Sequence, residues 1–256
     1  HQIAKVFSTH NVNLVYTYLP TSADKTYFLP PALTNGNVHG IIVLNVYNER
    51  LLRLLAETQI PKVFLDTSSL VAPDELNGDL LLMESRTSVR RITSHLLEQG
   101  RTLPGFIGDI SYAQSNRERY EGFCQALTDA GKKVDSSLCL TTPLGIDTYR
   151  EEIDTFLSSL SRMPDAFVCA SDYVACILMQ LLEKRGLRVP EDVAVSGFDN
   201  NTEDLLAEHL TTVQVFNEEL GARLALQILY RIKYPNTPHE VTYLGTNVLY
   251  RDSTGD

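Results

Sequence analysis

Short apolar runs alternate with amphipathic stretches along most of this chain, and this alternation limits its fold more than any other feature. Residues 40–44 are continuously apolar, as expected for a parallel strand that is covered on both faces. Residues 49–57 follow with leucines at helical spacing, and residues 61–66 are predicted as the next strand. Strands that alternate with helices at this spacing form parallel sheets with right-handed crossovers. The sequence therefore predicts an α/β fold.

The same patterns continue to the end of the chain. They predict further strands at 12–18, 79–83, 105–108, 138–141, 164–169, 193–195, 211–215, 241–244 and 247–250. They predict helices at 85–99, 115–130, 145–160, 172–185, 203–207 and 217–233, and a short helix is possible within 27–35. There are too many strand–helix units for a single sheet of ordinary width, so we expect two α/β lobes with a first boundary near residues 100–104.

Composition excludes several classes of protein. A chain of 256 residues is normal for two lobes of about 100–150 residues each. The net charge of −10 repels phosphate backbones, so these residues are not expected to bind nucleic acid unaided. No run of eighteen apolar residues exists, so no membrane-spanning segment is predicted. Four cysteines match no zinc-binding spacing, and buried free thiols favour a cytoplasmic location.

The start of the chain predicts that more protein precedes it. Residue 1 is not Met, and residues 1–7 have the pattern of the end of a helix with no strand before it. No signal peptide is present. We therefore expect a preceding segment upstream of residue 1.

Motifs for catalysis are absent from the sequence. There is no Gly-x-Ser-x-Gly elbow, no phosphate-binding Gly-x-x-x-x-Gly-Lys loop and no Gly-x-Gly-x-x-Gly fingerprint. The six histidines are scattered, and none has a second His or a carboxylate at metal-ligand spacing. We predict that the protein is not an enzyme and needs no cofactor or metal.

Polar side chains instead gather after the predicted strands, where ligands of open α/β sheets bind. Asp109 and Tyr112 follow strand 105–108, Ser171 follows strand 164–169, and Asp199 follows strand 193–195. Carboxylates that converge with an arginine commonly bind hydroxyl-rich ligands through hydrogen bonds. Alternatively, each of these residues caps the helix that follows it, and for Asp199 the two interpretations weigh about equally.

Two further residues complete the predicted site. Glu84 follows strand 79–83, and Arg119 lies one turn into helix 115–130. Capping explains Arg119 less well, because a cation near a helix N-terminus opposes the helix dipole. Capping explains Asp172 well, because it directly follows Ser171 at the start of helix 172–185.

Several segments resemble the lactose-repressor (LacI/GalR) family of transcriptional regulators. Residues 115–123 resemble its S-x-x-x-R-x-x-G-F motif, residues 169–175 its C-A-N/S-D-x-x-A motif, and residues 185–193 its R-G-L-x-V-P-x-D-V motif. The remaining matches are 197–200 (G-F/Y-D-D/N), 210–213 (L-T-T-V), 218–221 (E-x-L-G) and 249–253 (V-x-R-x-S). Order and spacing hold from about residue 38 to residue 253, and together these motifs are specific.

The resemblance implies two periplasmic-binding-protein-like lobes, each a parallel sheet flanked by helices, joined by three crossovers. We expect residues 1–102 and 215–245 in the N-terminal lobe, and 103–214 and 246–256 in the C-terminal lobe, with crossovers near 100–104, 213–216 and 245–247. The resemblance further implies a homodimer in the cytoplasm. We expect a helix-turn-helix headpiece upstream of residue 1, which would bind operator DNA. We also expect the first strand of the N-terminal lobe upstream of residue 1.

By motif match, Arg119, Ser171 and Asp199 take the family's ligand positions, and the expected effector is a sugar or sugar derivative. Glu84 stands where members often have Asp, so it reaches about one methylene further. Val215 and Phe216 stand where members often have Gln-Pro after T-T-V-R, so that contact is lost or replaced by an apolar wall. The alternative is an extracytoplasmic sugar-binding protein of a transporter, which has the same lobes and no DNA role.

Overall fold

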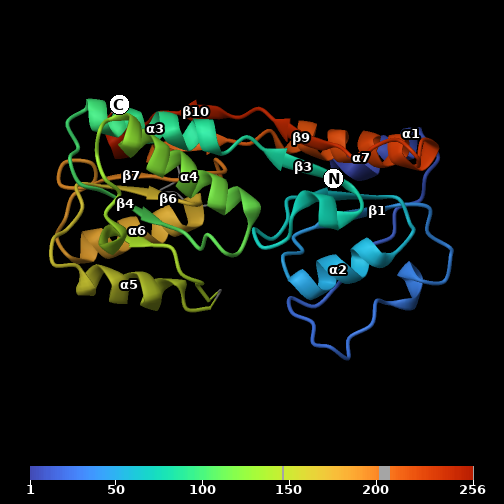
Figure 1. The fold of residues 1–256 in the computed structure, drawn as a ribbon. Helices are drawn as coiled ribbons and strands as arrows, with labels where there is room; N and C mark the ends of the chain where they lie inside the picture. Colours follow the sequence, from blue (N-terminus) through green and yellow to red (C-terminus); the bar gives the residue numbers. More distant parts are fainter. Residues whose placement is uncertain (146, 202–207, 256) are drawn as a thin grey trace. The chain divides into compact units, whose positions relative to one another are not determined.

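The computed structural model describes residues 1–145, 147–201 and 208–255 (Figure 1). Parallel strands and helices alternate in it, as the sequence predicts. Its contacts divide the chain into two compact units. Unit 1 comprises residues 1–83, 113–115 and 216–245, and unit 2 comprises residues 84–112, 116–215 and 246–256.

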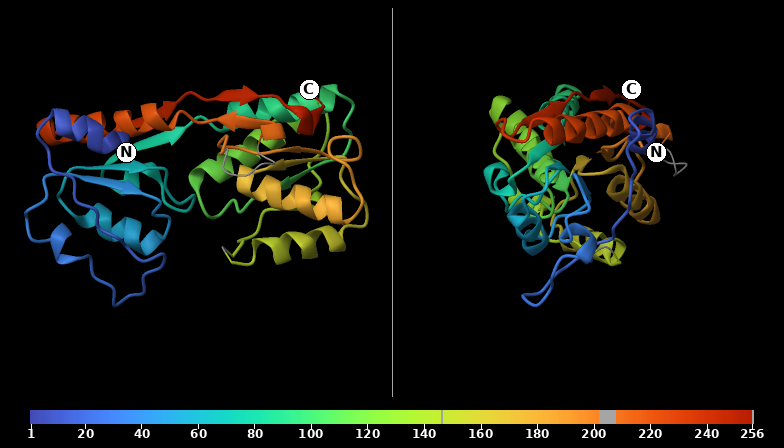
Figure 2. Two further views of the ribbon diagram at one scale, coloured as in Figure 1. Left: turned by 180° about the vertical axis from the view of Figure 1, so that it is seen from behind. Right: turned by 90° about the vertical axis from the view of Figure 1, so that its right-hand side faces the viewer.

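Unit 1 is built on one parallel sheet with helices on both faces. Its strand order is β1-β2-β3-β9, with β1 at Ile41–Leu44, β2 at Lys62–Leu65, β3 at Asp79–Met83 and β9 at Val241–Leu244. Helix α2 (Glu49–Glu57) covers one face and α7 (Asn217–Lys233) the other (Figure 1). Helix α1 (Gln2–Thr9) packs along α7 (Figure 2). Two 3₁₀ helices, Pro31–Leu33 and Pro73–Leu76, lie in its loops.

The sequence explains α2 locally. The Asn48 side chain accepts a hydrogen bond from the backbone N–H of Leu51 at 3.1 Å and so caps the helix, and the acidic Glu49 follows in the first turn. Leu52 and Leu55 then point into a core that also contains Phe64. The leucine spacing that predicts the helix is therefore the face that buries it.

Unit 2 contains a second parallel sheet with the strand order β5-β4-β6-β7. These strands are β4 (Pro104–Ile107), β5 (Cys139–Leu140), β6 (Ala166–Cys169) and β7 (Ala194–Ser196). Helices α5 (Tyr149–Ser159) and α6 (Asp172–Lys184) cover one face, and α3 (Arg86–Glu98) and α4 (Gln114–Asp129) the other (Figure 1). Strands β8 (Thr212–Gln214) and β10 (Asn247–Leu249) form an antiparallel pair. The 3₁₀ helices of this unit are Ser136–Leu138 and Asp252–Thr254.

The predicted strand at residues 12–18 is wrong, because the structure has no strand there. Val15 and Tyr18 are 75% and 92% exposed. A strand is stable only beside a paired neighbour, and none of the pairings of β1 involves this segment. The helix predicted at 203–207 lies outside the described residues.

The boundary between the units also differs from the predicted one. Residues 84–102, expected in the N-terminal lobe, group with unit 2. Helix α3 is tied there by two ion pairs to α4, Arg86 with Glu121 and Arg90 with Asp129. Its His95 ring also packs at a tilt against Tyr250, with 4.4 Å between the ring centroids. In the described part of the chain, no helix is long and apolar enough to cross a membrane.

Candidate functional site

Strands β4, β6 and β7 are parallel neighbours in unit 2, so their carboxyl ends meet at one edge of the sheet. Residues 109–112, 170–172 and 199–201 follow these three strands directly. The sequence therefore delivers three polar segments to one place, as the predicted site requires.

Arg119, on α4, is the centre of this edge. Its side chain is 5% exposed, and its guanidinium lies 3.6 Å from the centroid of the Phe198 ring. One terminal nitrogen donates to the carbonyl of Ala170, and the other lies 3.7 Å from a carboxylate oxygen of Asp199. The Nε–H is buried and has no hydrogen-bond partner among the described residues. A buried donor of this kind costs free energy unless something else accepts its proton.

Asp199 occupies a strained backbone conformation at the end of β7. Its φ is +111°, and that of the next residue, Asn200, is +52°. Non-glycine residues rarely adopt positive φ, and such strain concentrates at functional sites. The Asp199 side chain is 45% exposed, yet the protein atoms crowding it raise the pKa of its carboxyl, while Arg119 lowers it. The conformation thus turns the Asp199 carboxylate towards Arg119, but the two groups are too far apart for a hydrogen bond.

A hydrogen-bond network holds this turn in place. The backbone N–H of Asp199 donates to the carbonyl of Val213 at 3.0 Å. The Asn200 side chain donates to Gln214 at 2.5 Å and accepts from the guanidinium of Arg251 at 2.8 Å. Strand β8 and the C-terminal segment therefore fix the residues that the G-F-D-N motif supplies.

Ser171, and not Asp172, caps the helix that follows β6. Ser171 is the N-cap of α6, with its hydroxyl 3.3 Å from the backbone N–H of Val174. The prediction that Asp172 is a helix cap is wrong. Its carboxylate accepts from the backbone N–H of Asn201 at 2.7 Å and from the hydroxyl of Thr212 at 2.6 Å. Burial raises the pKa of Asp172 to about 6 against the opposing effect of these hydrogen bonds.

Asp109 organises the loop after β4. Its carboxylate accepts from the backbone N–H and hydroxyl of Ser111 at 2.8 and 2.6 Å, and from the backbone N–H of Tyr112 at 3.1 Å. Asp109 is buried, whereas the Tyr112 side chain is 45% exposed. Asp109 therefore shapes the loop, and Tyr112 is the side chain that the loop presents.

Sequence reasoning missed two tyrosines: Tyr149, which lies near Tyr112 and Asp109, and Tyr173, which contacts Tyr149. The rings of Tyr149 and Tyr173 meet edge to face with 5.7 Å between centroids, and Tyr173 is 60% exposed. Burial, together with the nearby Tyr112 and Asp109, raises the pKa of Tyr149. The first residues of α5 and α6 thus bring an aromatic surface to the loop after β4. No spacing in the sequence could signal this, because the tyrosines come from different units of the α/β repeat.

Glu84 and Phe216, also predicted as ligand residues, belong to other segments of the chain, before α3 and before α7. The Glu84 carboxylate accepts from the backbone N–H groups of Thr87 and Ser88, at 2.5 and 3.1 Å, and so caps its own helix α3. Phe216 precedes α7 in unit 1 and is 39% exposed. Within residues 1–145, 147–201 and 208–255, no three His, Cys, Asp or Glu side chains are grouped so that they could hold a metal ion.

Comparison with known proteins yields a consistent set of similarities. Residues 93–254 match the family model of the periplasmic binding protein-like domain. The repressor PurR of Glaesserella parasuis is 27% identical over 80% of this chain and 59% of its own length. The regulator DegA of Bacillus subtilis is 31% identical over 66% of this chain and 48% of its own length. The chain thus spans about half to three fifths of these relatives.

The fold is also similar to that of solved structures. The complex of the transcriptional regulator CelR with cellobiose superposes with a TM-score of 0.77 and 27% identity, and the match covers 87% of this chain and 68% of that chain. The Arg119 edge thus lies in a fold of which one solved example holds a disaccharide.

Proposed function

Since the chain belongs to the family of periplasmic-binding-protein-like domains, in the form found in LacI-type transcriptional regulators, we propose that it is an effector-binding core that senses a sugar or sugar derivative. The observation that carries this proposal is the incomplete pair of Arg119 and Asp199. The buried Nε–H of Arg119 has no acceptor among the described residues, and the Asp199 carboxylate lies 3.7 Å from a terminal nitrogen of the same guanidinium, so both side chains keep hydrogen-bonding groups that a ligand could use.

The chemistry of the edge supports a hydroxyl-rich effector. A carboxylate accepts hydroxyl protons and a guanidinium donates to hydroxyl oxygens, so Arg119 and Asp199 together suit a vicinal diol. Tyr112, Tyr149 and Tyr173 offer aromatic surface of the kind that packs against the apolar faces of sugar rings. The cellobiose bound to CelR is consistent with this class of ligand.

The other predicted ligand residues have lesser parts in the proposal. The Ser171 hydroxyl and the Asp109 carboxylate already bond to the backbone, so they shape the site and make at most secondary contacts. Glu84 is engaged with its own helix, and Phe216 belongs to unit 1, so their contributions remain predictions. We rank Arg119 and Asp199 first because, among the predicted ligand residues, Arg119 combines burial with a donor that has no acceptor in the described part of the chain, and Asp199 combines backbone strain with a carboxylate facing that arginine.

The role of the whole protein extends the proposal. An attached headpiece would bind operator DNA, the effector would control that binding in the cytoplasm, and the cores would pair because two-fold operators suit a two-fold protein. The relatives named as regulators weigh against the transporter-linked alternative. Light scattering should give a dimer of 28.7 kDa chains, and a gel shift with residues 1–256 should give no sequence-specific, salt-sensitive binding.

A thermal-shift screen over sugars, sugar phosphates and nucleosides tests the effector class. A ligand at a hundred times its dissociation constant adds about 2.7 kcal/mol to the stability of the core. The hit should be a sugar compound, and Arg119→Met should lose its shift while the exposed Arg188→Met keeps it. A nucleoside as the only hit, or a sugar shift unchanged in Arg119→Met, would contradict the proposal.

A further inference from the structure

Asp172 lies beneath the Asp199 turn and has no direct part in the proposed site. It is 2% exposed, and its two carboxylate oxygens serve two different segments. Oδ2 accepts from the backbone N–H of Asn201 at 2.7 Å, and Oδ1 accepts from the hydroxyl of Thr212 at 2.6 Å. The backbone N–H of Asp172 also donates to the carbonyl of Phe198 at 2.8 Å. One residue therefore contacts the turn on both sides of Asp199.

The space around this carboxylate is shaped to admit it. A side chain at Gly197 would place its Cβ 2.3 Å from Oδ1 of Asp172, so only glycine fits there. Thr212, which donates to Oδ1, accepts from the backbone N–H of Asn200 at 3.2 Å. The carboxylate thus contacts Asn201 directly, and it contacts Asn200 through the Thr212 hydroxyl.

We propose that Asp172 is a positioning residue for effector binding, whose negative charge holds the Asn200–Asn201 backbone and thereby keeps Asp199 turned towards Arg119. This inference rests on the proposed function, because it assigns a purpose to the orientation of Asp199. It goes beyond that function by making the orientation depend on whether Asp172 is ionised.

Protonation would disturb the arrangement at either oxygen. A proton on Oδ2 would face the N–H of Asn201, so two donors would meet. A proton on Oδ1 would require Thr212 to accept it, although the same hydroxyl oxygen already accepts from Asn200. Either proton leaves one buried donor without an acceptor, which a buried site tolerates poorly. The ionised form is therefore the one that matches the turn.

Charged and titratable neighbours modulate this ionisation. Asp199, in the turn above, and burial favour the neutral acid, whereas Arg251 from the C-terminal segment favours the carboxylate. Cys169, at the end of β6, also lies in the field of Asp172. With a pKa of about 6, Asp172 is ionised at neutral pH and becomes neutral as the solution is acidified. The turn should loosen over the same range.

Backbone NMR of the ligand-free protein between pH 5 and pH 8 tests the device itself. The amide resonance of Asn201 should titrate with a midpoint near pH 6, with the Asp199 amide following it. In Asp172→Asn both resonances should stay near their acidic positions at every pH. Glu183→Gln, on the exposed side of the same helix, should behave as the parent. If the Asn201 and Asp199 amides of Asp172→Asn coincide with those of the parent at pH 8, the proposal is overturned.

A second arm measures affinity for cellobiose, or for the saccharide that the screen identifies, at pH 8 and pH 5. Asp172→Asn should bind about tenfold more weakly than the parent at pH 8, the effect of one buried hydrogen bond. Both should bind with similar affinity at pH 5. Asp199 is present in both proteins, so the difference between their affinities at pH 8 reports on Asp172. If neither binds any saccharide, the proposed function fails, while the ligand-free titration still decides the role of Asp172.

Should Asp172→Asn fail to fold, the parent's own titration needs no variant. Thr212→Val then removes the partner of Oδ1, and Thr212→Ser keeps its hydroxyl. The valine variant should shift the Asn200 and Asn201 amides at pH 8, and the serine variant should restore them. Equal spectra for the two variants would contradict the proposal.

Discussion

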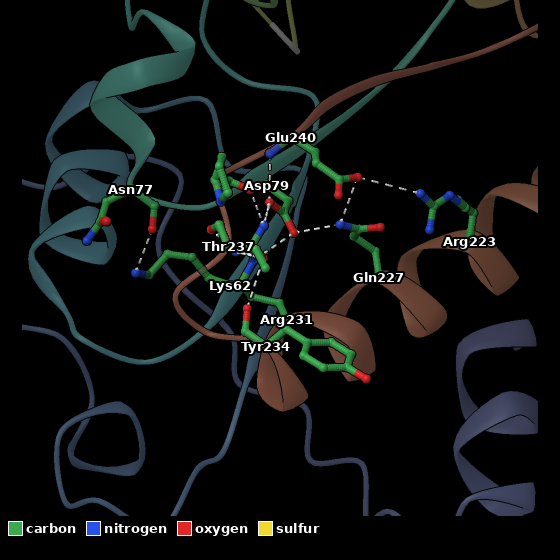
Figure 3. Close-up of polar contacts among 10 residues, drawn as sticks. Lys62, Asn77, Asp79, Arg223, Gln227, Arg231, Tyr234, Thr237 and Glu240 are labelled. Atoms are coloured by element: carbon green, nitrogen blue, oxygen red, sulfur yellow. Dashed lines mark hydrogen bonds and ion pairs between the residues drawn. The ribbon is translucent and has the colours of Figure 1, made fainter.

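The two units each contain an arginine–carboxylate pair at a sheet edge, and the two pairs are built differently. In unit 1, Arg231 and Asp79 are 2% and 0% exposed and bond through two contacts of 2.6 and 3.1 Å (Figure 3). In unit 2, Arg119 and Asp199 are 3.7 Å apart, and the carboxylate is 45% exposed. We call the hydrogen-bonded pair of Arg231 and Asp79 the closed pair, and the separated pair of Arg119 and Asp199 the open pair.

The surroundings of the closed pair satisfy its remaining groups. Arg231 also donates to the carbonyls of Thr237 and Pro238, at 2.5 and 2.9 Å. Asp79 also accepts from Gln227 at 2.7 Å and from the backbone N–H of Glu240 at 2.9 Å (Figure 3). These bonds join α7 to the starts of β3 and β9. They lower the pKa of Asp79 against the effect of its burial. A closed network of this kind has nothing left to offer a ligand, so its role is to hold unit 1 together.

The difference shows how to separate a structural ion pair from a binding site. Burial alone does not distinguish them, because Arg119 and Arg231 are almost equally buried. The deciding feature is whether every donor has an acceptor: each nitrogen of Arg231 has one, and Nε of Arg119 has none. Breaking the closed pair should therefore cost stability, and breaking the open one should cost binding.

The largest loss of stability is expected when the closed pair is broken. Arg231→Met should lower the free energy of unfolding by about 3–5 kcal/mol, because it leaves Asp79 as an uncompensated buried charge. Chemical denaturation measures this loss. Arg223→Met is the matched control on the same helix, since Arg223 lies 3.9 Å from Glu240 at a half-exposed position. It should cost at most about 1 kcal/mol. Equal losses for the two variants would contradict the structural role of the closed pair.

A buried cation near the closed pair gives a pH-dependent effect. Lys62 is 2% exposed and donates to the carbonyl of Thr58 at 2.9 Å. It also donates to the carbonyl of Asn77 at 3.1 Å (Figure 3). Burial lowers the pKa of Lys62 to about 8, so the folded protein binds this proton less tightly than the unfolded chain does. The stability of the parent relative to Lys62→Met should therefore rise from pH 8 to pH 10.5. The rise should be on the order of 2–3 kcal/mol.

Denaturation of both proteins at pH 7, 8, 9 and 10 measures the relative stability. Below pH 8 the difference between the parent and Lys62→Met should be constant, because Lys62 is protonated in the folded and unfolded states alike. A difference that stays flat up to pH 10 would contradict the lowered pKa.

Breaking the open pair should change the free energy of unfolding least, and it should clearly weaken effector binding. Asp199→Ala should weaken effector binding by roughly thirty- to two-hundredfold, the cost of about 2–3 kcal/mol for one partner of a charge-assisted hydrogen bond. The fold should survive, because the core residues of β7 keep their contacts. Calorimetry gives both quantities, with Asp192→Ala, a partly exposed aspartate that pairs with Arg188 before β7, as the control. Parent-like binding would reduce Asp199 to a turn residue, and failure to fold would make it structural.

The sequence predicted the elements whose cause is local. Helix α2 was predictable because Asn48 and the leucine spacing act within one stretch of chain. The strand predicted at 12–18 is not formed, since a strand needs a paired neighbour and the local pattern cannot show whether one is present. Recognisable motifs pointed to Arg119 and Asp199, and the structure gives the two residues a common edge.

Tertiary contacts account for what could not be predicted in the site. Asp172 has the local pattern of a cap, but its partners Asn201 and Thr212 lie 29 and 40 residues away. Arg231 looks like an ordinary cation in the last turn of α7, because Asp79 is 152 residues distant. Pattern reveals that a residue is polar, and only the fold reveals whether its partners are already present.

The Nε–H of Arg231 has an acceptor within the protein, whereas we infer that the Nε–H of Arg119 gains one only when the effector binds. The side-chain Nε–H resonances of the two arginines test this inference most directly. In ¹H–¹⁵N spectra assigned with Arg119→Lys and Arg231→Lys, saturation with the effector should move the Arg119 Nε–H resonance downfield and leave that of Arg231 in place. A hydrogen bond to the effector causes that movement. An Arg119 Nε–H resonance that does not change on effector binding, or two resonances that move equally, would contradict the account.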